Sequence, residues 1–388
     1  MHHVNAAASE RLRILHVSEV HWGGVVTLLG HFVEQQFLDG HDVHVLAHPG
    51  MPSLHPGAIV HQWELDRARP RSLPAARREL HRLVGVLEPD VVHLHSWFAG
   101  ALGRTPPTLR GAGKVPVVYQ PHAWSDRLSS RPGAALAVRA SERFFARHTD
   151  VLVVNCEDEL NRGRDLGVWT PGHSLGVAVD LTRFRPPTQV ERCAARALLG
   201  IPEGRRLALV LGRLTWQKGQ DLLVPAWVAA PAPDTTLALV GPGDPGPLAL
   251  LAGGENGRSV ILPGGTDEVL PWLWAADVMV LSSRYETVAL VIAEAMSTGL
   301  PVVATAVDGA EEVLQGGPED PAGTVVPLDD MGGLVREFSH RLDDPVLHAH
   351  ESAAGPVRAR ELFAPHVVAR RLEAAYWDAI HQHHAEKR

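Results

Sequence analysis

Short runs of aliphatic and β-branched residues recur along the chain, separated by longer amphipathic stretches. The runs are apolar at nearly every position, which is typical of parallel strands covered by helices on both faces. The segment 74–87 shows the other pattern, with apolar residues at helical spacing. We predict strands at 14–17, 42–46, 91–95, 115–119, 151–154, 207–211, 236–240, 259–262, 278–281, 301–305 and 323–326. The alternation predicts an α/β fold built from doubly wound, Rossmann-like sheets.

The alternation is interrupted at residues 180–188, where two prolines follow a polar stretch. A chain of 388 residues is too long for one core of ~100 to 200 residues, so we interpret the interruption as an interdomain connection with its hinge near 184–195. The predicted parts are an N-terminal domain (1–187), a second domain (188–364) and a C-terminal helix (365–388). The pattern leaves open where this helix docks, and a return to the N-terminal domain is one option. Two such sheets predict a central cleft at the carboxyl ends of their strands.

Composition narrows the class of protein. The chain is 45% hydrophobic and 21% charged, and its 44 acidic against 36 basic residues leave a formal charge of −8. That sign argues against nucleic acid or anionic lipid as a partner. We find neither an apolar run long enough to span a membrane nor a signal-peptide pattern, so we expect a cytoplasmic protein. The two cysteines, Cys156 and Cys193, support neither a disulfide framework nor a four-cysteine zinc site.

Two cations follow the first strand of the second domain. Arg213 and Lys218 lie on a short loop between that strand and a helix that opens near Gly219. Two fixed positive charges beside the N-terminus of a helix favour a dianion such as a diphosphate. The alternative is a pair of solvated loop charges. Lys218 is one of only three lysines in the chain, which favours a specific role.

Two glutamates eight residues apart form a second candidate site. Glu286 follows a predicted strand, whereas Glu294 lies inside an apolar helix and needs a partner there. A carboxylate only accepts hydrogen bonds, so the two hydroxyl groups of a nucleotide ribose suit Glu294 well. The alternatives are a helix carboxylate paired with an arginine for Glu294 and an ordinary loop acid for Glu286.

The first domain offers weaker candidates. Gly23 and Gly24 form a turn from strand to helix that lets backbone approach a phosphate or sugar, although a tight turn alone also explains them. His93 and His95 share one face of a strand, and His122 follows the next strand. We do not predict a metal site, because no cysteine or carboxylate stands at ligand spacing. Side chains that could contact an acceptor are His21, Trp22, His95, Trp97 and Trp124. Core packing is the alternative for the three tryptophans, and a structural or incidental role is the alternative for His95 and His122.

These residues resemble the retaining glycosyltransferases of family 4, which have the GT-B fold. The resemblance rests on Gly-Arg-Leu-x-x-x-Lys-Gly at 212–219, the Glu286 and Glu294 pair, and Gly-x-Pro-Val-Val-Ala at 299–304. It extends over nearly the whole chain through weaker matches at 90–95, 122, 179–184, 241–243, 276–277 and 309–312. The chain departs from the family at Thr287 and Val288, where glycine and phenylalanine are common.

The resemblance implies metal-independent transfer of a sugar from a nucleoside diphosphate donor with retention at the anomeric carbon. The implied catalytic residues are His122, Glu286, Arg213 and Lys218. The expected donor-binding residues are Gly23, Gly24, Arg213, Lys218, Gly265, Thr266, Glu286, Thr287, Val288, Ala289, Leu290, Val291 and Glu294. No cofactor is expected, since the nucleotide sugar is a co-substrate. Fixed cations suit this reaction because charge separates between the sugar and the departing diphosphate.

The expected partners are a nucleotide sugar, with UDP as the favoured nucleotide, and a small soluble acceptor such as an aglycone, an aminocyclitol or a sugar phosphate. The acidic chain shows no cationic amphipathic helix for docking on a lipid surface. Three alternatives stay open: exopolysaccharide or lipid-linked saccharide assembly, a nucleotide-sugar epimerase of the same fold, and a non-catalytic binding protein. The oligomeric state is also open.

Overall fold

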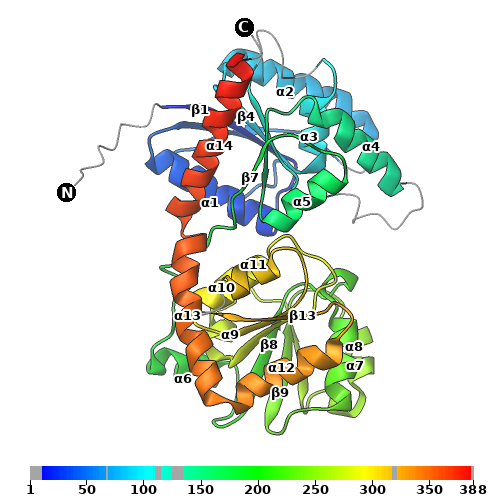
Figure 1. Cartoon of the computed structure of the whole chain (residues 1–388), viewed down its shortest axis with the longest axis vertical. Helices are drawn as coiled ribbons and strands as arrows, with labels where there is room; N and C mark the ends of the chain where they lie inside the picture. Colours follow the sequence, from blue (N-terminus) through cyan, green and yellow to red (C-terminus); the bar gives the residue numbers. More distant parts are fainter. Residues whose placement is uncertain are drawn as a thin grey trace, which may run out of the picture. The chain divides into compact units, whose positions relative to one another are not determined.

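The computed structural model describes residues 11–66, 69–107, 109, 115–124, 134–316 and 321–385. Contacts between residues divide the chain into two compact units, one of Met1–Ala178 with Pro365–Arg388 and the other of Val179–Ala364. The chain therefore crosses between the units at 178–179 and again at 364–365. Figure 1 labels the helices of both units and some of their strands.

The described part of the first unit holds a seven-stranded parallel sheet in the order β3-β2-β1-β4-β5-β6-β7. Its strands are β1 (Arg13–Ser18), β2 (Asp42–Ala47), β3 (Ile59–Gln62), β4 (Val91–His95), β5 (Val117–Gln120), β6 (Val151–Val154) and β7 (Gly172–Ser174). The sequence pattern missed β3 and β7, the two edge strands, because neither is an apolar run. Ile59 and Val60 of β3 are half exposed. Strand β5 begins after Pro116, which has no N–H to donate to the sheet.

Helices cover both faces of this sheet. They are α1 (Gly24–Leu38), α2 (Leu73–Leu87), α3 (Ser96–Arg104), α4 (Ala134–Ala146), α5 (Glu157–Asp165) and α14 (Pro365–Ala385), with a 3-10 turn at Pro70–Ser72. Helices α1 and α14 lie side by side on one face (Figure 1), where Phe32 and Tyr376 join one apolar cluster with Ile14 of the sheet. Helices α2 and α3 contribute to the cluster on the other face. The last helix of the chain thus completes the core of the first unit.

The second unit contains, within its described residues, a six-stranded parallel sheet in the order β10-β9-β8-β11-β12-β13. Its strands are β8 (Arg206–Leu211), β9 (Thr235–Val240), β10 (Val260–Gly264), β11 (Val278–Leu281), β12 (Val302–Thr305) and β13 (Gly323–Val326). All six lie where the apolar runs predicted strands. Two doubly wound parallel sheets confirm the predicted α/β fold class.

The helices of the second unit are α6 (Gln189–Leu198), α7 (Gln220–Ala229), α8 (Gly246–Ala252), α9 (Leu270–Ala275), α10 (Leu290–Ser297), α11 (Ala310–Gln315), α12 (Met331–Asp343) and α13 (Pro345–Phe363). Two 3-10 turns, Trp216–Lys218 and Gly253–Glu255, also belong to it. Side chains from α7, α8 and α12 pack on β8, β9 and β11 in the core.

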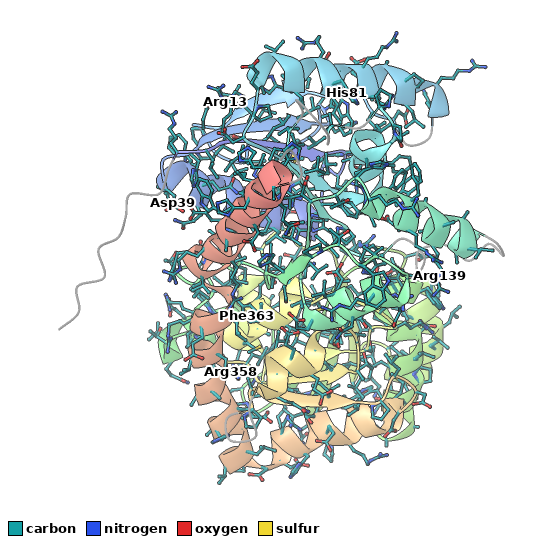
Figure 2. The ribbon with its side chains drawn as sticks, turned by 45° about the horizontal axis from the view of Figure 1, so that its top comes forward. Arg13, Asp39, His81, Arg139, Arg358 and Phe363 are labelled. Carbon is teal, nitrogen blue, oxygen red and sulfur yellow. The ribbon has the colours of Figure 1, made fainter. Side chains whose placement is uncertain are left out.

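Residues 180–188, which the sequence suggested as a linker, are ordered within the second unit. The Asp180 carboxylate accepts the Thr182 N–H at 2.9 Å, and the Phe184 side chain is buried. Thr188 and Glu191 form a capping box that starts α6. The Val179 N–H donates to the carbonyl oxygen of Phe363, labelled in Figure 2, at 3.0 Å. This bond joins the points where the chain enters and leaves the unit.

The described helices include none with the length and apolar character needed to cross a membrane.

Candidate functional site

The loops that follow β8 and β11 pack closely against each other at the carboxyl edge of the second sheet. Gly219 adopts a left-handed conformation (φ +67°), and a β-carbon there would stand 2.0 Å from the Ser282 carbonyl oxygen. The Ser282 hydroxyl donates to the Lys218 carbonyl oxygen at 2.9 Å. Glycine is therefore required at position 219 for the two loops to approach this closely.

This close approach brings Lys218 and Glu286 into contact. The Lys218 Nζ lies 2.6 Å from Glu286 Oε1, and the Ser283 hydroxyl donates to the same oxygen at 2.8 Å. The two charged side chains are only 14% and 10% exposed. Sequence reasoning assigned them to different parts of a ligand, whereas the structure pairs them. Both bonds engage Oε1, so Glu286 Oε2 can accept a further hydrogen bond.

Arg213 lies on the same loop as Lys218, and its side chain is exposed. Its carbonyl oxygen accepts the side-chain amide of Gln220 at 3.0 Å. At Gly241, in the loop after β9, a β-carbon would stand 2.0 Å from the Gly212 carbonyl oxygen. The loops after β8 and β9 are thus packed backbone against backbone, which fixes the course of the chain at Arg213.

Gly265 and Thr266 lie on the next loop, which follows β10, and both are exposed. The backbone of Gly265 lies against Pro242, since a β-carbon on Gly265 would stand 3.3 Å from that ring. The Thr266 hydroxyl donates to the Glu268 carbonyl oxygen at 3.0 Å. These predicted donor-binding residues therefore lie at the same sheet edge as the loops after β8 and β9.

Arg284, which was not predicted from the sequence, links these loops through hydrogen bonds and a ring contact. Arg284 donates two hydrogen bonds to the Asp221 carboxylate, at 2.7 and 2.8 Å, and its guanidinium lies 4.8 Å from the centre of the Trp216 ring. The bonds to Asp221 raise the pKa of Arg284 and lower that of Asp221. An arginine directly before Tyr285 and Glu286 was the only signal in the sequence, and it does not indicate a partner 63 residues away.

Residues 287–291 form the entry to α10. Ala289 precedes the helix, and Leu290 and Val291 are its first two residues. Val288 adopts a left-handed conformation (φ +65°), is buried, and donates its N–H to the Asp308 carbonyl oxygen at 3.2 Å. Such a φ is strained for a β-branched residue. Thr287 pairs with Asp308 in an isolated β-bridge. Of the two positions that depart from the family pattern, Val288 is therefore the one with a strained backbone.

Glu294 lies on α10 and is largely desolvated. Desolvation by burial raises the pKa of its carboxyl group to about 7, and the charge of Arg183 opposes that shift. Within the described residues Arg183 forms its ion pair with Glu268, at 3.1 Å, and no arginine pairs with Glu294. The alternative of a paired structural glutamate thus finds no support here. Burying the ionised carboxylate of Glu294 costs free energy, and hydrogen bonds from the hydroxyl groups of a ligand would offset that cost.

In the first unit, Gly23 is left-handed (φ +80°) and Gly24 opens α1. A β-carbon at either position would meet no atom within 4 Å, so the backbone at this turn faces open space. The conformation explains glycine at position 23 but not at 24. Trp22 beside them is 57% exposed, and His21 stacks on His48 with ring centroids 4.1 Å apart.

Two further predicted acceptor contacts differ in exposure. Trp124 is 2% exposed, and its indole N–H donates to the Glu159 carbonyl oxygen at 2.8 Å. This burial favours the alternative of core packing, because the ring has no free face for a ligand. Trp97 is partly buried, stacks edge to face with Phe98, and its indole nitrogen is buried without a hydrogen-bond partner among the described residues.

His95 and His122 belong to a line of histidines. His95 Nδ1 lies 2.9 Å from His122 Nε2, and His95 Nε2 lies 2.9 Å from His16 Nδ1. His93 and His95 share one face of β4, as their spacing predicted, with ring centroids 4.0 Å apart. Burial lowers the pKa of His122 to about 3 and that of His16 to about 4. These rings are therefore neutral at pH 7.

Three of these histidines also lie close enough together to be considered as metal ligands. One nitrogen from each of His16, His93 and His95 lies within 4.8 Å of the others, and all three side chains are buried. The hydrogen bond between His16 and His95 already uses one nitrogen of each ring, so one of those two atoms carries a proton. The contacts fit a hydrogen-bonded cluster of neutral rings.

Comparisons with known proteins identify the family. Residues 23–173 match the family described as glycosyl transferase 4-like domain, and residues 205–344 match glycosyl transferases group 1. The chain is 30% identical over 369 residues to D-inositol 3-phosphate glycosyltransferase of Thermobispora bispora, covering 87% of this chain and 84% of that protein. It is 28% identical over 369 residues to the lipopolysaccharide core biosynthesis mannosyltransferase LpsB of Rhizobium meliloti, covering 91% and 93%.

The fold also matches a solved structure. The crystal structure of Anabaena Alr3699/HepE in complex with UDP-glucose superposes with a TM-score of 0.76 at 18% identity, covering 94% of this chain and 99% of that one. Two Rossmann-like units with these relatives define a glycosyltransferase of the GT-B fold. The chain belongs to glycosyltransferase family 4, as its motifs suggested.

Proposed function

We propose that this glycosyltransferase moves a hexose from a UDP-sugar to a small polyhydroxylated or phosphorylated acceptor, with retention at the anomeric carbon. The observation that carries the proposal is the arrangement at the carboxyl edge of the second sheet. There a nearly buried lysine contacts a glutamate, and α10 carries a second, desolvated glutamate. A nucleotide sugar offers a matching set of groups: a diphosphate, sugar hydroxyls and ribose hydroxyls.

Each charged residue has one part of the donor to recognise. Glu294 accepts hydrogen bonds from the ribose hydroxyls, which suit an acceptor-only group. Glu286 accepts a hydroxyl of the transferred sugar through Oε2 and keeps its bond to Ser283 through Oε1. Lys218 and Arg213 stabilise the diphosphate. His122 contacts the sugar or the phosphate beside the reacting centre, as the resemblance to the family implies.

The chemistry follows from charge. As the glycosidic bond breaks, the sugar becomes oxocarbenium-like and negative charge grows on the departing diphosphate. Lys218 is held near its place by the loop contacts of Gly219 and Ser282, so little reorganisation is needed when that charge develops. We propose that these cations replace a metal ion. Activity should therefore persist in excess chelator, and strict dependence on magnesium or manganese would contradict this part of the proposal.

The identity of the nucleotide is tested by binding. UDP-, GDP-, ADP- and dTDP-sugars are each added to the protein and its midpoint of thermal unfolding is measured. A ligand at one hundred times its Kd stabilises the folded state by about 2.7 kcal/mol, which gives a clear shift. We expect the largest shift with UDP-sugars. A larger shift with GDP-sugars would overturn the UDP assignment, and no shift with any of them would overturn the donor site itself.

The acceptor is either a small soluble molecule or a lipid-linked saccharide, and the relatives support both. The D-inositol 3-phosphate glycosyltransferase of T. bispora is named for a small phosphorylated acceptor, which supports a soluble acceptor here. LpsB is named for the lipopolysaccharide core, and that similarity supports a second candidate, a lipid-linked saccharide. An acceptor panel with inositol phosphates, hexose phosphates and a lipid-linked saccharide, read as nucleotide release, separates the two. We expect release with a soluble phosphorylated acceptor.

A further inference from the structure

Arg183 belongs to the segment 180–188 of the second unit, which begins with a turn held by Asp180. The Asp180 carboxylate accepts the N–H groups of Thr182 and Arg183 at 2.9 and 3.2 Å. The next side chain, Phe184, is buried, and the Arg183 guanidinium lies 5.3 Å from the centre of its ring. The side chain of Arg183 therefore extends from a backbone that is fixed on both sides.

The segment 180–188 runs along α10, the helix that carries Glu294. A β-carbon on Gly299, just beyond the end of this helix, would stand 3.7 Å from the ring of Pro186. Glu294 lies five residues before Gly299, roughly 7.5 Å along the helix axis, and Arg183 lies three residues before Pro186. These spacings bring Arg183 near Glu294. Burial raises the pKa of Glu294, and the charge of Arg183 acts in the opposite direction.

The other elements that pack against α10 offer Glu294 no comparable charge. Strands β11 and β12 contain no titratable side chain. Those of α13 that are not exposed have partners of their own: His348 the carbonyl oxygen of Asp277, Glu351 the guanidinium of Arg341, and Arg358 the carbonyl oxygens of Glu312 and Val313. The rest of α13 contributes only exposed groups, namely His350, Arg360 and Glu361.

The ion-pair partner of Arg183 is a different carboxylate. Arg183 donates to Glu268 Oε2 at 3.1 Å, and the two side chains are 45% and 72% exposed. Glu268 lies on the loop after β10, where its N–H donates to the Thr266 hydroxyl at 3.1 Å. An ion pair this exposed is weak, so Arg183 can leave Glu268 at little cost in free energy. Glu294 is partly buried, and water screens the same positive charge less there.

We propose that Arg183 is a positioning residue of the nucleotide site: it stabilises the ionised carboxylate of Glu294, and Glu268 competes with Glu294 for it. The inference rests on the proposed function for its effect on nucleotide binding, because ionised Glu294 is the form that accepts hydrogen bonds from both ribose hydroxyls. Arg183 thus acts on nucleotide affinity through Glu294. Glu268 links that affinity to the loop of Gly265 and Thr266, which was predicted to bind the donor.

The first measurement follows Glu294 itself. Protein labelled with ¹³C at the side-chain carboxyl groups of glutamate is titrated by NMR, and the Glu294 signal is identified by its loss in Glu294→Gln. Arg183→Gln removes the positive charge, so the titration midpoint of Glu294 should move to higher pH. Glu268→Gln removes the competing carboxylate, so the midpoint should move to lower pH. Unchanged midpoints in both variants would overturn the proposal.

Two control variants separate charge from local packing. Arg183→Lys keeps the positive charge and should titrate close to the wild type. Arg185→Gln alters a neighbouring arginine of the same segment, which is also 45% exposed and forms its ion pair with Glu191. This variant should leave the Glu294 midpoint unchanged. A shift as large as that of Arg183→Gln would show that the effect does not belong to Arg183.

The second measurement is calorimetric titration of UDP at pH 6 and pH 9. Arg183→Gln should bind UDP about two- to fivefold more weakly than the wild type at pH 6, where most of Glu294 is protonated. At pH 9 the two proteins should bind equally, because Glu294 is ionised in both. Glu268→Gln should bind UDP more tightly than the wild type at pH 6 and equally at pH 9.

A double substitution tests whether Arg183 acts through Glu294. In the Glu294→Gln background, Arg183→Gln should cause no further change in the Kd for UDP. A loss of affinity in that background, or an equal loss at pH 6 and pH 9, would show direct contact with the nucleotide and overturn the positioning role. Shifted Glu294 midpoints in a protein that binds no nucleotide would support the link between Arg183 and Glu294 and refute the proposed function.

Discussion

Glu294 predicts a specific pH dependence for nucleotide binding. Burial raises the pKa of its carboxyl group to about 7, yet the proposed bonds to two ribose hydroxyls require the ionised form. Binding should therefore lower this pKa and release a proton, and the affinity for UDP should rise with pH through about 7. The perturbation that isolates the effect is Glu294→Gln, which has similar shape and no charge.

The magnitude follows from the titration. With a pKa of about 7, roughly 10% of the free protein carries ionised Glu294 at pH 6 and roughly 90% at pH 8. If only the ionised form binds, the Kd for UDP should fall about ninefold over this range. At pH 8 the glutamine variant loses charge-assisted bonds of ~1.5 to 3 kcal/mol each and should bind at least about tenfold more weakly.

The assay is calorimetric titration of UDP at pH 6, 7 and 8 into both proteins. The phosphate of UDP itself titrates in this range, so the quantity of interest is the ratio of the two dissociation constants at each pH. That ratio should grow about ninefold from pH 6 to pH 8. Glu361→Gln, an exposed glutamate of α13, serves as the control and should follow the wild type. A constant ratio close to one would refute the placement of the ribose at Glu294.

Three further variants test the same site. Lys218→Ala should lower kcat by about 10² to 10³ with a smaller change in donor affinity, because the charge on the leaving group grows in the transition state. Near-normal turnover would show that Lys218 is only a structural partner of Glu286. Gly219→Ala places a β-carbon 2.0 Å from the Ser282 carbonyl oxygen, at a residue with left-handed backbone conformation. The free energy of unfolding, measured by urea denaturation, should fall by at least about 1 to 3 kcal/mol. Unchanged stability would contradict the packing of the two loops. Thr287→Gly combined with Val288→Phe should change the ratio of kcat/KM for two sugars on the same nucleotide without changing the Kd for UDP, and an unchanged ratio would place sugar selectivity elsewhere.

The repeating pattern along the chain was sufficient for the architecture. Buried parallel strands are continuous apolar runs, so the central strands of the first sheet and all six of the second were predictable. The two edge strands of the first sheet were not predictable, because Ile59–Gln62 and Gly172–Ser174 are short and partly exposed. Polar residues at 180–188 suggested a linker, and the turn and cap bonds that order this stretch have no periodic signal.

Side-chain contacts between residues far apart in the chain could not be predicted from the sequence. Lys218 and Glu286 were both selected as candidates, but their contact depends on the bonds between two loops that are 68 residues apart. Arg183 and Glu268 are 85 residues apart, and neither was selected as a candidate. His16 gave a signal that was not used, namely a polar side chain in the middle of an apolar strand.

Glycosyl transfer itself is tested by identifying the product and its anomeric configuration. The purified protein is incubated with UDP-hexose, a soluble phosphorylated acceptor and excess chelator, and the product is analysed by NMR, with Lys218→Ala as the control. We predict an acceptor glycoside with the same anomeric configuration as the donor, formed far more slowly by the variant. Inverted configuration would contradict the retaining mechanism. The absence of any acceptor-dependent product with every donor and acceptor of the panels would contradict glycosyl transfer itself.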